Sequence, residues 1–342
     1  MAVAGCGTHE AMILDRSGAT VSAAKVLVDV EWSRLLDDTS TARVLIRPEG
    51  DCCERLGLVR SWRHKLALWR DGEPVWDGPI LNAEWTREGV EIWAGDILAW
   101  LDRRVPHQTA RFGDSDLTDI ATWLIEDGFA PDDPGHSLYV VGPSGVRGAR
   151  AYTRDVGQTG DHLKDLAETG IDYTAVGSTI ILLPEDHTAS VGRLTDADLP
   201  EGLTVAEDGV SLATRWVVAG SDENDVIGEA GGVDPYYGLL EKYEEQTSIL
   251  DSPSAAAAAR SRLRSSLPVP VFLDSERVTL SPEAAVAVPK LVPGWCLDVA
   301  STSTCRTVAQ RLKIVGVRVT ENGDGESVQV QLAPTGAGVE AA

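Results

Sequence analysis

Two stretches of the chain, residues 64–95 and 295–333, share one order of features: a strand, a loop, a longer strand, a glycine turn with an acidic residue, and a returning strand. In the first stretch, Asp71-Gly72 supplies the positive-φ residues of a tight turn, and Arg87-Glu88-Gly89 reverses the chain again. In the second, the reversal falls at Asn322-Gly323-Asp324-Gly325. The match is in pattern more than in residue identity. It predicts a duplicated β domain.

The first third of the chain reads as strands and is rich in tryptophan. In residues 25–32 an apolar face, which includes Trp32, alternates with a mainly polar face. Residues 75–107 contain four tryptophans, followed by Asp-Arg-Arg at 102–104: Trp76, Trp85, Trp93 and Trp100. Asp96 is expected to cap a short helix that packs its apolar residues inward, with Pro106 beyond its end. We expect the tryptophans to pack on a β core, with Trp100 closing the open end of the first barrel.

The middle of the chain predicts a small α/β unit. Asp116 or Ser115 caps a helix from Leu117, with Gly128 just past its end. A second helix covers residues 160–170, and a hairpin over 171–184 follows it. From about residue 201 the pattern returns to strands. One helix interrupts them, where Ser252-Pro253-Ser254 caps an alanine-rich segment.

These patterns predict an α+β fold that is mainly β. Two antiparallel β-barrel-like domains are expected at residues 1–108 and 201–342, with a small α/β domain at 109–200 between them. The second β domain would carry a helical insertion near 252–267. We expect closed or nearly closed barrels, because closure removes exposed strand edges that would otherwise aggregate.

Charge and composition exclude several functions. The chain has 53 acidic and 30 basic residues and a formal net charge of −23, which argues against specific binding of nucleic acid. No run approaches the 18 or so apolar residues of a membrane span, so no membrane insertion is expected. Val3-Ala4-Gly5-Cys6 looks like a lipoprotein cleavage box but lacks the basic and apolar segments before it. The five cysteines are irregularly spaced and read as reduced thiols.

No catalytic, cofactor-binding or metal-binding residue is predicted. The acidic pairs Asp132-Asp133 and Glu244-Glu245 carry little weight, because 53 acidic residues make chance pairs common. The six histidines are scattered without a metal-binding spacing, and neither Cys52-Cys53 nor Ser144 lies in a nucleophile motif. Residues 221–229 could wrap calcium through three side chains, although a solvated loop is the simpler reading: Asp222, Asn224 and Asp225.

A sugar-binding module is an alternative, since exposed tryptophans form stacking platforms. Trp76 and Trp93 would both have to point outward. In residues 90–95, alternation places Trp93 opposite Val90 and Ile92. Trp93 is therefore expected to be covered by a second layer, a helix or a neighbouring subunit, or else to form a ligand platform.

Several segments together resemble a known family. VWDGPI at 75–80, GDILAWLDRR at 95–104, DHLKDLAETGIDYTAVGSTIILL at 161–183, VTLSPEAAVAVPKLVPGWCLDV at 278–299 and RLKIVGVRVTENGDGESVQVQL at 311–332 follow in this order. The chain resembles the minor tail proteins, related to the baseplate hub, of long-tailed actinobacterial phages. The resemblance covers residues from about 25 to 333.

The resemblance implies a structural tail-tip protein of the virion, assembled in the host cytoplasm and without enzyme activity. Hubs of this family are homotrimers that close the tail tube. Their partners would be the distal tail protein, the C-terminus of the tape measure protein, and the tail tip or central fibre protein. DNA would pass through the channel without specific binding, and an acidic wall would keep it moving. A cell-wall hydrolase is the least favoured alternative.

Overall fold

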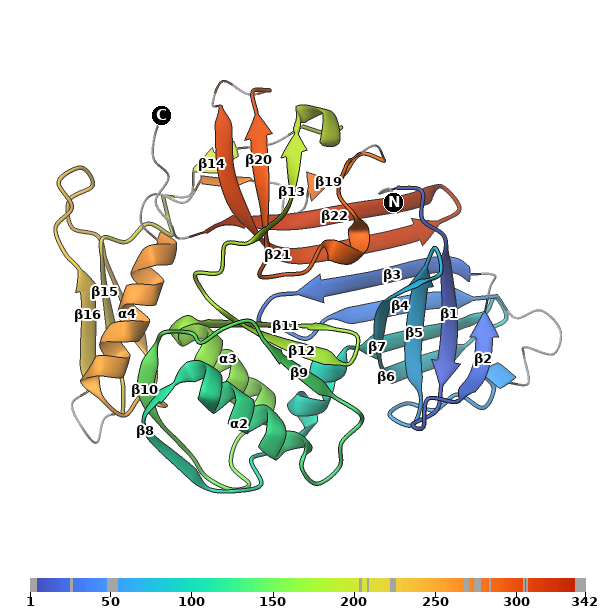
Figure 1. Ribbon diagram of the computed structural model, residues 1–342, viewed down its shortest axis with the longest axis horizontal. Helices are drawn as coiled ribbons and strands as arrows, with labels where there is room; N and C mark the ends of the chain where they lie inside the picture. Colours follow the sequence, from blue (N-terminus) through green and yellow to red (C-terminus); the bar gives the residue numbers. More distant parts are fainter. Residues whose placement is uncertain are drawn as a thin grey trace.

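The computed structural model describes residues 5–24, 27–47, 55–202, 205–207, 209–221, 226–266, 271–273, 278–282, 284–303, 305 and 307–335 (Figure 1). Long strands from both ends of the chain run across the molecule side by side. A unit with two helices lies against them, and a small sheet with one helix lies at one end of the long axis (Figure 1).

Both ends of the chain contribute to one sheet of twelve strands. Its N-terminal strands are β1 (His9–Leu14), β2 (Thr20–Ala24), β3 (Leu27–Leu35), β4 (Thr41–Ile46), β5 (Lys65–Arg70), β6 (Glu73–Trp85) and β7 (Val90–Gly95). Its later strands are β13 (Ser190–Thr195), β19 (Val278–Thr279), β20 (Cys296–Ser301), β21 (Val308–Asn322) and β22 (Gly325–Pro334). The order is β13-β20-β21-β3-β4-β7-β6-β5-β1-β2, with β22 beside β21 and β19 beside β22.

The repeated pattern predicted for residues 64–95 and 295–333 is present in strand order and direction. Strands β5, β6 and β7 correspond to β20, β21 and β22, and all the pairings within each set are antiparallel. In both sets the middle strand is the longest. Its first part pairs with the preceding strand and its later part with the following one. Strand β4 flanks β7 as β19 flanks β22, again antiparallel.

The two sets also share their register. Ile80 in β6 exchanges two backbone hydrogen bonds, of 2.7 and 3.0 Å, with the residues just before β5. Ile314 in β21 exchanges two bonds of 2.8 Å with the residues just before β20. Immediately after each isoleucine the register shifts by one residue, so that Leu81 and Val315 are the bulged residues.

The core of this sheet is continuous between the two halves. Trp32, Ile80, Ile314 and Val330, each at most 1% exposed, belong to one buried cluster. The expected closed barrels are not found among the described residues. Instead β3 pairs antiparallel with β21, and the sheet runs as an open path. This pairing covers edges that two separate barrels would have had to close individually.

The middle unit contains the two helices and the hairpin that the sequence predicts, together with further strands that were not predicted and the short helix that was expected in the first β domain. It contains η1 (Ile97–Arg103), β8 (Ala110–Asp116), α2 (Leu117–Phe129), β9 (Ser137–Val140), β10 (Arg147–Tyr152), α3 (Thr159–Gly170), β11 (Ile171–Val176) and β12 (Thr179–Pro184). The Asp116 side chain accepts a hydrogen bond from the Thr118 N–H at 2.9 Å, which confirms the N-cap. Gly128 lies inside α2 and not beyond it.

Helix η1 packs differently from our expectation. Asp96 caps it, accepting the Leu98 N–H at 2.9 Å. Its apolar residues belong to the core of the middle unit, and Trp100 packs against that core. The expectation that Trp100 plugs the first barrel is therefore wrong. The helix follows β7 directly and packs mainly against α3.

The third part of the structure has its own small core. Strands β15 (Arg215–Ala219), β16 (Ile227–Gly231) and β17 (Glu241–Glu245) form a sheet in the order β16-β15-β17, and α4 (Ser252–Ser266) covers one face. Gly228 permits this approach, because a Cβ there would collide with the backbone of Ala255 and Ala256. Nearby, β14 (Val205–Glu207) pairs with β18 (Val271–Leu273). The domain boundaries at residues 108 and 201 remain a proposal.

Candidate functional site

The large sheet has one buried and one polar face. On β3, Val30 and Trp32 point into the core, so Asp29 and Glu31 lie on the opposite side. Across this second side, Arg43 is 2.8 Å from Asp29 and is also bonded to Glu91. Two further side chains of the same face, Arg318 and Glu31, are paired at 2.7 Å. We call Asp29, Glu31, Arg43, Glu91, Trp93 and Arg318 the polar face.

The structure decides between the two tryptophans proposed as sugar platforms. Trp76 is 4% exposed and belongs to the core, so it cannot stack on a sugar. Trp93 is half-buried and lies on the polar face, opposite Arg43 on β4 and Asn82 on β6. The hypothesis that Trp76 and Trp93 together form a sugar platform is therefore wrong.

The Asp-Arg-Arg segment after Trp100 joins the middle unit to the N-terminal strands. Asp102 accepts a hydrogen bond from the Thr39 hydroxyl at 2.9 Å. The Arg103 guanidinium lies 5.5 Å from the ring of Trp62, and that of Arg104 lies 5.7 Å from the ring of Trp100. The two rings pack edge to face at 5.0 Å.

An acidic side chain completes this joint. Asp132, one of the acidic pair considered above, binds Arg16 from the β1–β2 turn and Arg104 at 3.3 Å. Its neighbour Asp133 pairs with His136 at 2.9 Å. Both carboxylates therefore hold loops together.

Buried ion pairs link the two halves of the large sheet. Arg70 of β5 and Glu326 of β22 have fully buried side chains, with Nε and Oε1 2.6 Å apart. Burial would raise the pKa of Glu326, but Arg70 and the Gly7 N–H hold it below its ordinary value. His9 bridges Glu321 and the indole of Trp32 at 2.7 and 2.9 Å. The pattern of the sequence contains no signal for these long-range pairs.

A second cluster of buried charged side chains lies where the two halves of the large sheet meet the middle unit. Lys313 of β21 is 2.6 Å from Asp172 of β11 and donates to the carbonyl of Glu185. Burial raises the pKa of Asp172 to about 6 in spite of this cation. Burial also raises the pKa of Asp37 well above its ordinary value, and the nearby charge of Asp172 adds to that effect. Asp37 in turn accepts the Tyr173 N–H at 2.8 Å.

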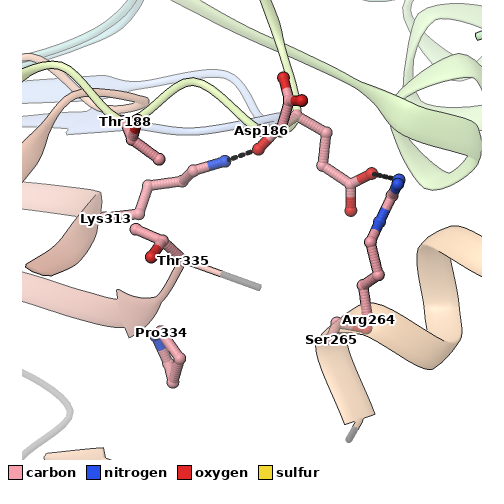
Figure 2. A pocket seen from close by; sticks show the side chains of 8 residues that line it. Asp186, Thr188, Arg264, Ser265, Lys313, Pro334 and Thr335 are labelled. Atoms are coloured by element: carbon pink, nitrogen blue, oxygen red, sulfur yellow. Dashed lines mark hydrogen bonds and ion pairs between the residues drawn. The ribbon is translucent and has the colours of Figure 1, made fainter. Parts of the chain in front are cut away.

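Beside Lys313 the surface is hollowed by a cavity of about 230 Å³. Figure 2 shows Lys313 and Arg264 reaching toward the segment at Asp186 from different elements, β21 and α4. Arg264 pairs with Glu185 at 2.9 Å. Since both cations already have acidic partners, the cavity is a joint between three parts of the chain and not a ready anion site.

Two of the remaining candidate residues make contacts with neighbouring side chains of the chain. Glu244 pairs with Arg262 at 2.6 Å, and the Ser144 hydroxyl donates to Asp116. Among the described residues, no group of three histidine, cysteine or acidic side chains could hold a metal ion. The calcium candidates Asp222, Asn224 and Asp225 and the pair Cys52-Cys53 lie outside the described residues. No described helix is long and apolar enough to cross a membrane.

Comparison with solved structures identifies the fold. The chain superposes on the 43 kDa tail protein of prophage MuSo2 from Shewanella oneidensis with a TM-score of 0.65 and 11% identity, covering 96% of this chain and 99% of that one. For the tail protein from Neisseria meningitidis MC58 the TM-score is 0.64 at 12% identity, covering 96% of each chain. This mainly β architecture is thus the fold of phage tail proteins.

The likeness extends to a secretion system. A component of the Escherichia coli type VI secretion system, described as structurally similar to the T4 bacteriophage tail proteins gp27 and gp5, matches with a TM-score of 0.56 and 13% identity. The match covers 92% of this chain and 76% of that one. No protein-family model and no curated protein sequence matches the chain. The relationship therefore lies in the fold.

Proposed function

We propose that this chain is a structural tail hub protein of a phage. Three copies would form a ring that closes the tail tube at the tail tip of the virion. The observation that carries the proposal is the end-to-end likeness to a prophage tail protein, which covers 96% of this chain and 99% of that one.

The duplicated strands support a trimer. A tail tube with six-fold symmetry can be met by three chains if each supplies two similar β units. The sets β5–β7 and β20–β22, equivalent at Ile80 and Ile314, are the two candidate units. The partners would be the distal tail protein, the end of the tape measure protein, and the tail tip or central fibre protein.

The experiment is to count copies. Native mass spectrometry of the purified protein and reconstruction of the assembled tail should give three, with the two units about 60° apart around the channel. Isolated chains can dissociate at low concentration, so the particle is the stricter test. Six identical copies in a ring would indicate a tube or distal tail protein instead.

The same proposal includes the absence of catalysis. Purified protein should leave peptidoglycan uncut, because Asp132, Asp133, Glu244 and Ser144 all make structural contacts. Release of muropeptides by a homogeneous preparation would favour the cell-wall hydrolase over the hub.

A further inference from the structure

One end of this acidic molecule carries arginines that form no ion pair with a described carboxylate. Residues 55–70 contain five basic residues and no acidic one, in a chain of 53 acidic and 30 basic residues. Arg55, Arg60, Arg63 and Arg103 are exposed, and none forms an ion pair with a described carboxylate. Elsewhere, some exposed arginines are paired with acids, as Arg147 and Arg311 are, and others form no ion pair with a described carboxylate, as at Arg111 and Arg193. Several such arginines gathered on one segment that contains no acidic residue indicate a surface that meets an acidic partner.

Apolar side chains are interleaved with these arginines. Leu58 is 61% exposed and Trp85, at the end of β6, is 50% exposed. The Trp85 indole donates to the Leu56 carbonyl at 3.1 Å, which joins the β6–β7 hairpin to the segment at 55–63. Arginine and tryptophan are the residues most enriched at the centres of protein interfaces. We call the set Arg55, Leu58, Arg60, Arg63, Trp85 and Arg103 the arginine surface.

The other end of the molecule shows the complementary composition. Residues 227–245 contain five acidic residues and one basic residue. Large side chains there are strongly exposed: Ile227 60%, Val233 76%, Tyr236 86%, Leu239 48% and Tyr243 66%. Since α4 covers the side of the small sheet that bears Val218, the opposite side, with Tyr243, is open in this chain.

Acidic groups surround those apolar side chains. Glu241 and Glu245 flank Tyr243 along β17 on its open side, and Arg215 is already shared between Glu229 and Glu241. We call Ile227, Val233, Tyr236, Glu241, Tyr243 and Glu245 the tyrosine face. An apolar patch with an acidic rim fits an apolar patch with a basic rim.

We infer that the arginine surface of one copy binds the tyrosine face of the next copy. The small sheet lies at one end of the long axis, and β2 and β5–β7 lie toward the other, so one chain cannot join its own two surfaces (Figure 1). A contact between two different surfaces repeats head to tail and closes into a ring when the rotation permits. The inference rests on the proposed ring and assigns its subunit contact.

Charge reversal tests this contact directly. Arg55→Glu with Arg63→Glu, and separately Glu241→Arg with Glu245→Arg, should each weaken self-association at least roughly tenfold in sedimentation equilibrium, because each change opposes like charges across the interface. In an equimolar mixture, the two variants have opposite charges at each mutual contact, but a ring of three must contain one contact between identical chains. That contact opposes like charges, so the mixture should not close a three-membered ring. The variant with all four changes should recover association to within about threefold of the unmodified chain.

The control is Arg111→Glu with Arg193→Glu, which reverses two exposed arginines outside the arginine surface. If the unmodified chain forms trimers and both reversals behave like this control, the subunit contact lies elsewhere and the ring itself stands. If no assembly forms in solution or in the particle, the hub proposal fails as well. If the unmodified protein slows duplex DNA in a gel and reversal of the arginine surface leaves self-association unchanged, the surface binds nucleic acid and the inference is overturned.

Discussion

Ile80 and Ile314 occupy equivalent positions in two strands from opposite ends of the chain. Each is fully buried, each bonds through its backbone to the segment just before the preceding strand, and each is followed by a one-residue bulge. Two β units that share this detail bend their long strand at the same place. The equivalence supports the proposal that the halves are copies of one unit.

If the environments are equivalent, truncation should cost the same at both positions. Ile80→Ala and Ile314→Ala should each lower the free energy of unfolding by about 2–5 kcal/mol, through lost burial and the cavity that remains. Urea denaturation followed by tryptophan fluorescence measures both. Because the two residues share one core, a single cooperative transition is expected for each variant. Two separate transitions would indicate that the halves fold independently.

Removing one partner of the Arg70–Glu326 pair should destabilise the folded protein strongly, whereas replacing both partners should destabilise it much less. Arg70→Met leaves the buried Glu326 carboxylate without its cation and should cost about 3–5 kcal/mol. Adding Glu326→Gln should recover much of that loss, because the uncompensated charge is removed. A double-mutant cycle from chemical denaturation gives the coupling. If Arg70→Met and the double variant lose the same free energy of unfolding, the loss does not come from the uncompensated charge of Glu326.

Buried acids should make the folded state less stable as pH rises toward neutrality. Burial raises the pKa of Asp96 from 3.8 to about 7, so between these values the folded chain holds a proton that the unfolded chain has released. By linkage, the free energy of unfolding should therefore decrease as pH rises through this window, by an amount on the order of a few kcal/mol. Asp172, with a pKa of about 6, acts in the same direction.

Asp96→Asn removes one of these titrations and should flatten the dependence between about pH 4 and pH 7. Thermal denaturation across this range measures it, with the exposed Asp119→Asn as the control. An unchanged slope in Asp96→Asn would mean that Asp96 stays ionised in the folded chain, held by the Ser40 and Leu98 N–H groups that it accepts.

The polar face should influence DNA passage if it lines the channel of the proposed ring. It bears three acidic side chains and two arginines, and both arginines are paired with acids, so it offers phosphate little attraction. Particles with Glu31→Lys and Glu91→Lys should eject DNA more slowly, most clearly at low salt. Asp119→Lys on α2 is the control. Equal ejection rates in both would place the polar face away from the channel.

Local features of this protein were determined by the sequence itself. Alternation and turn residues predicted the hairpins of both halves, and the capping residue Asp116 predicted the helix that begins at Leu117. The alanine-rich segment predicted the helix Ser252–Ser266, but the residues expected to cap it lie inside it, and Asp251 accepts the Ser254 N–H instead. The resemblance of the two hairpin sets was visible as a pattern, although not at the level of Ile80 and Ile314. Such features depend on neighbours within a few residues, where backbone geometry and side-chain periodicity are decisive.

The tertiary structure alone decided how these pieces join. Pairing of β3 with β21 turned two expected barrels into one open sheet, because a strand edge carries no local record of which distant strand will satisfy it. For the same reason, local sequence patterns did not predict that Trp100 packs against the core of the middle unit or that Arg70 pairs with Glu326. A tryptophan or an arginine is compatible with many buried partners, and the partner is selected by packing across the whole chain.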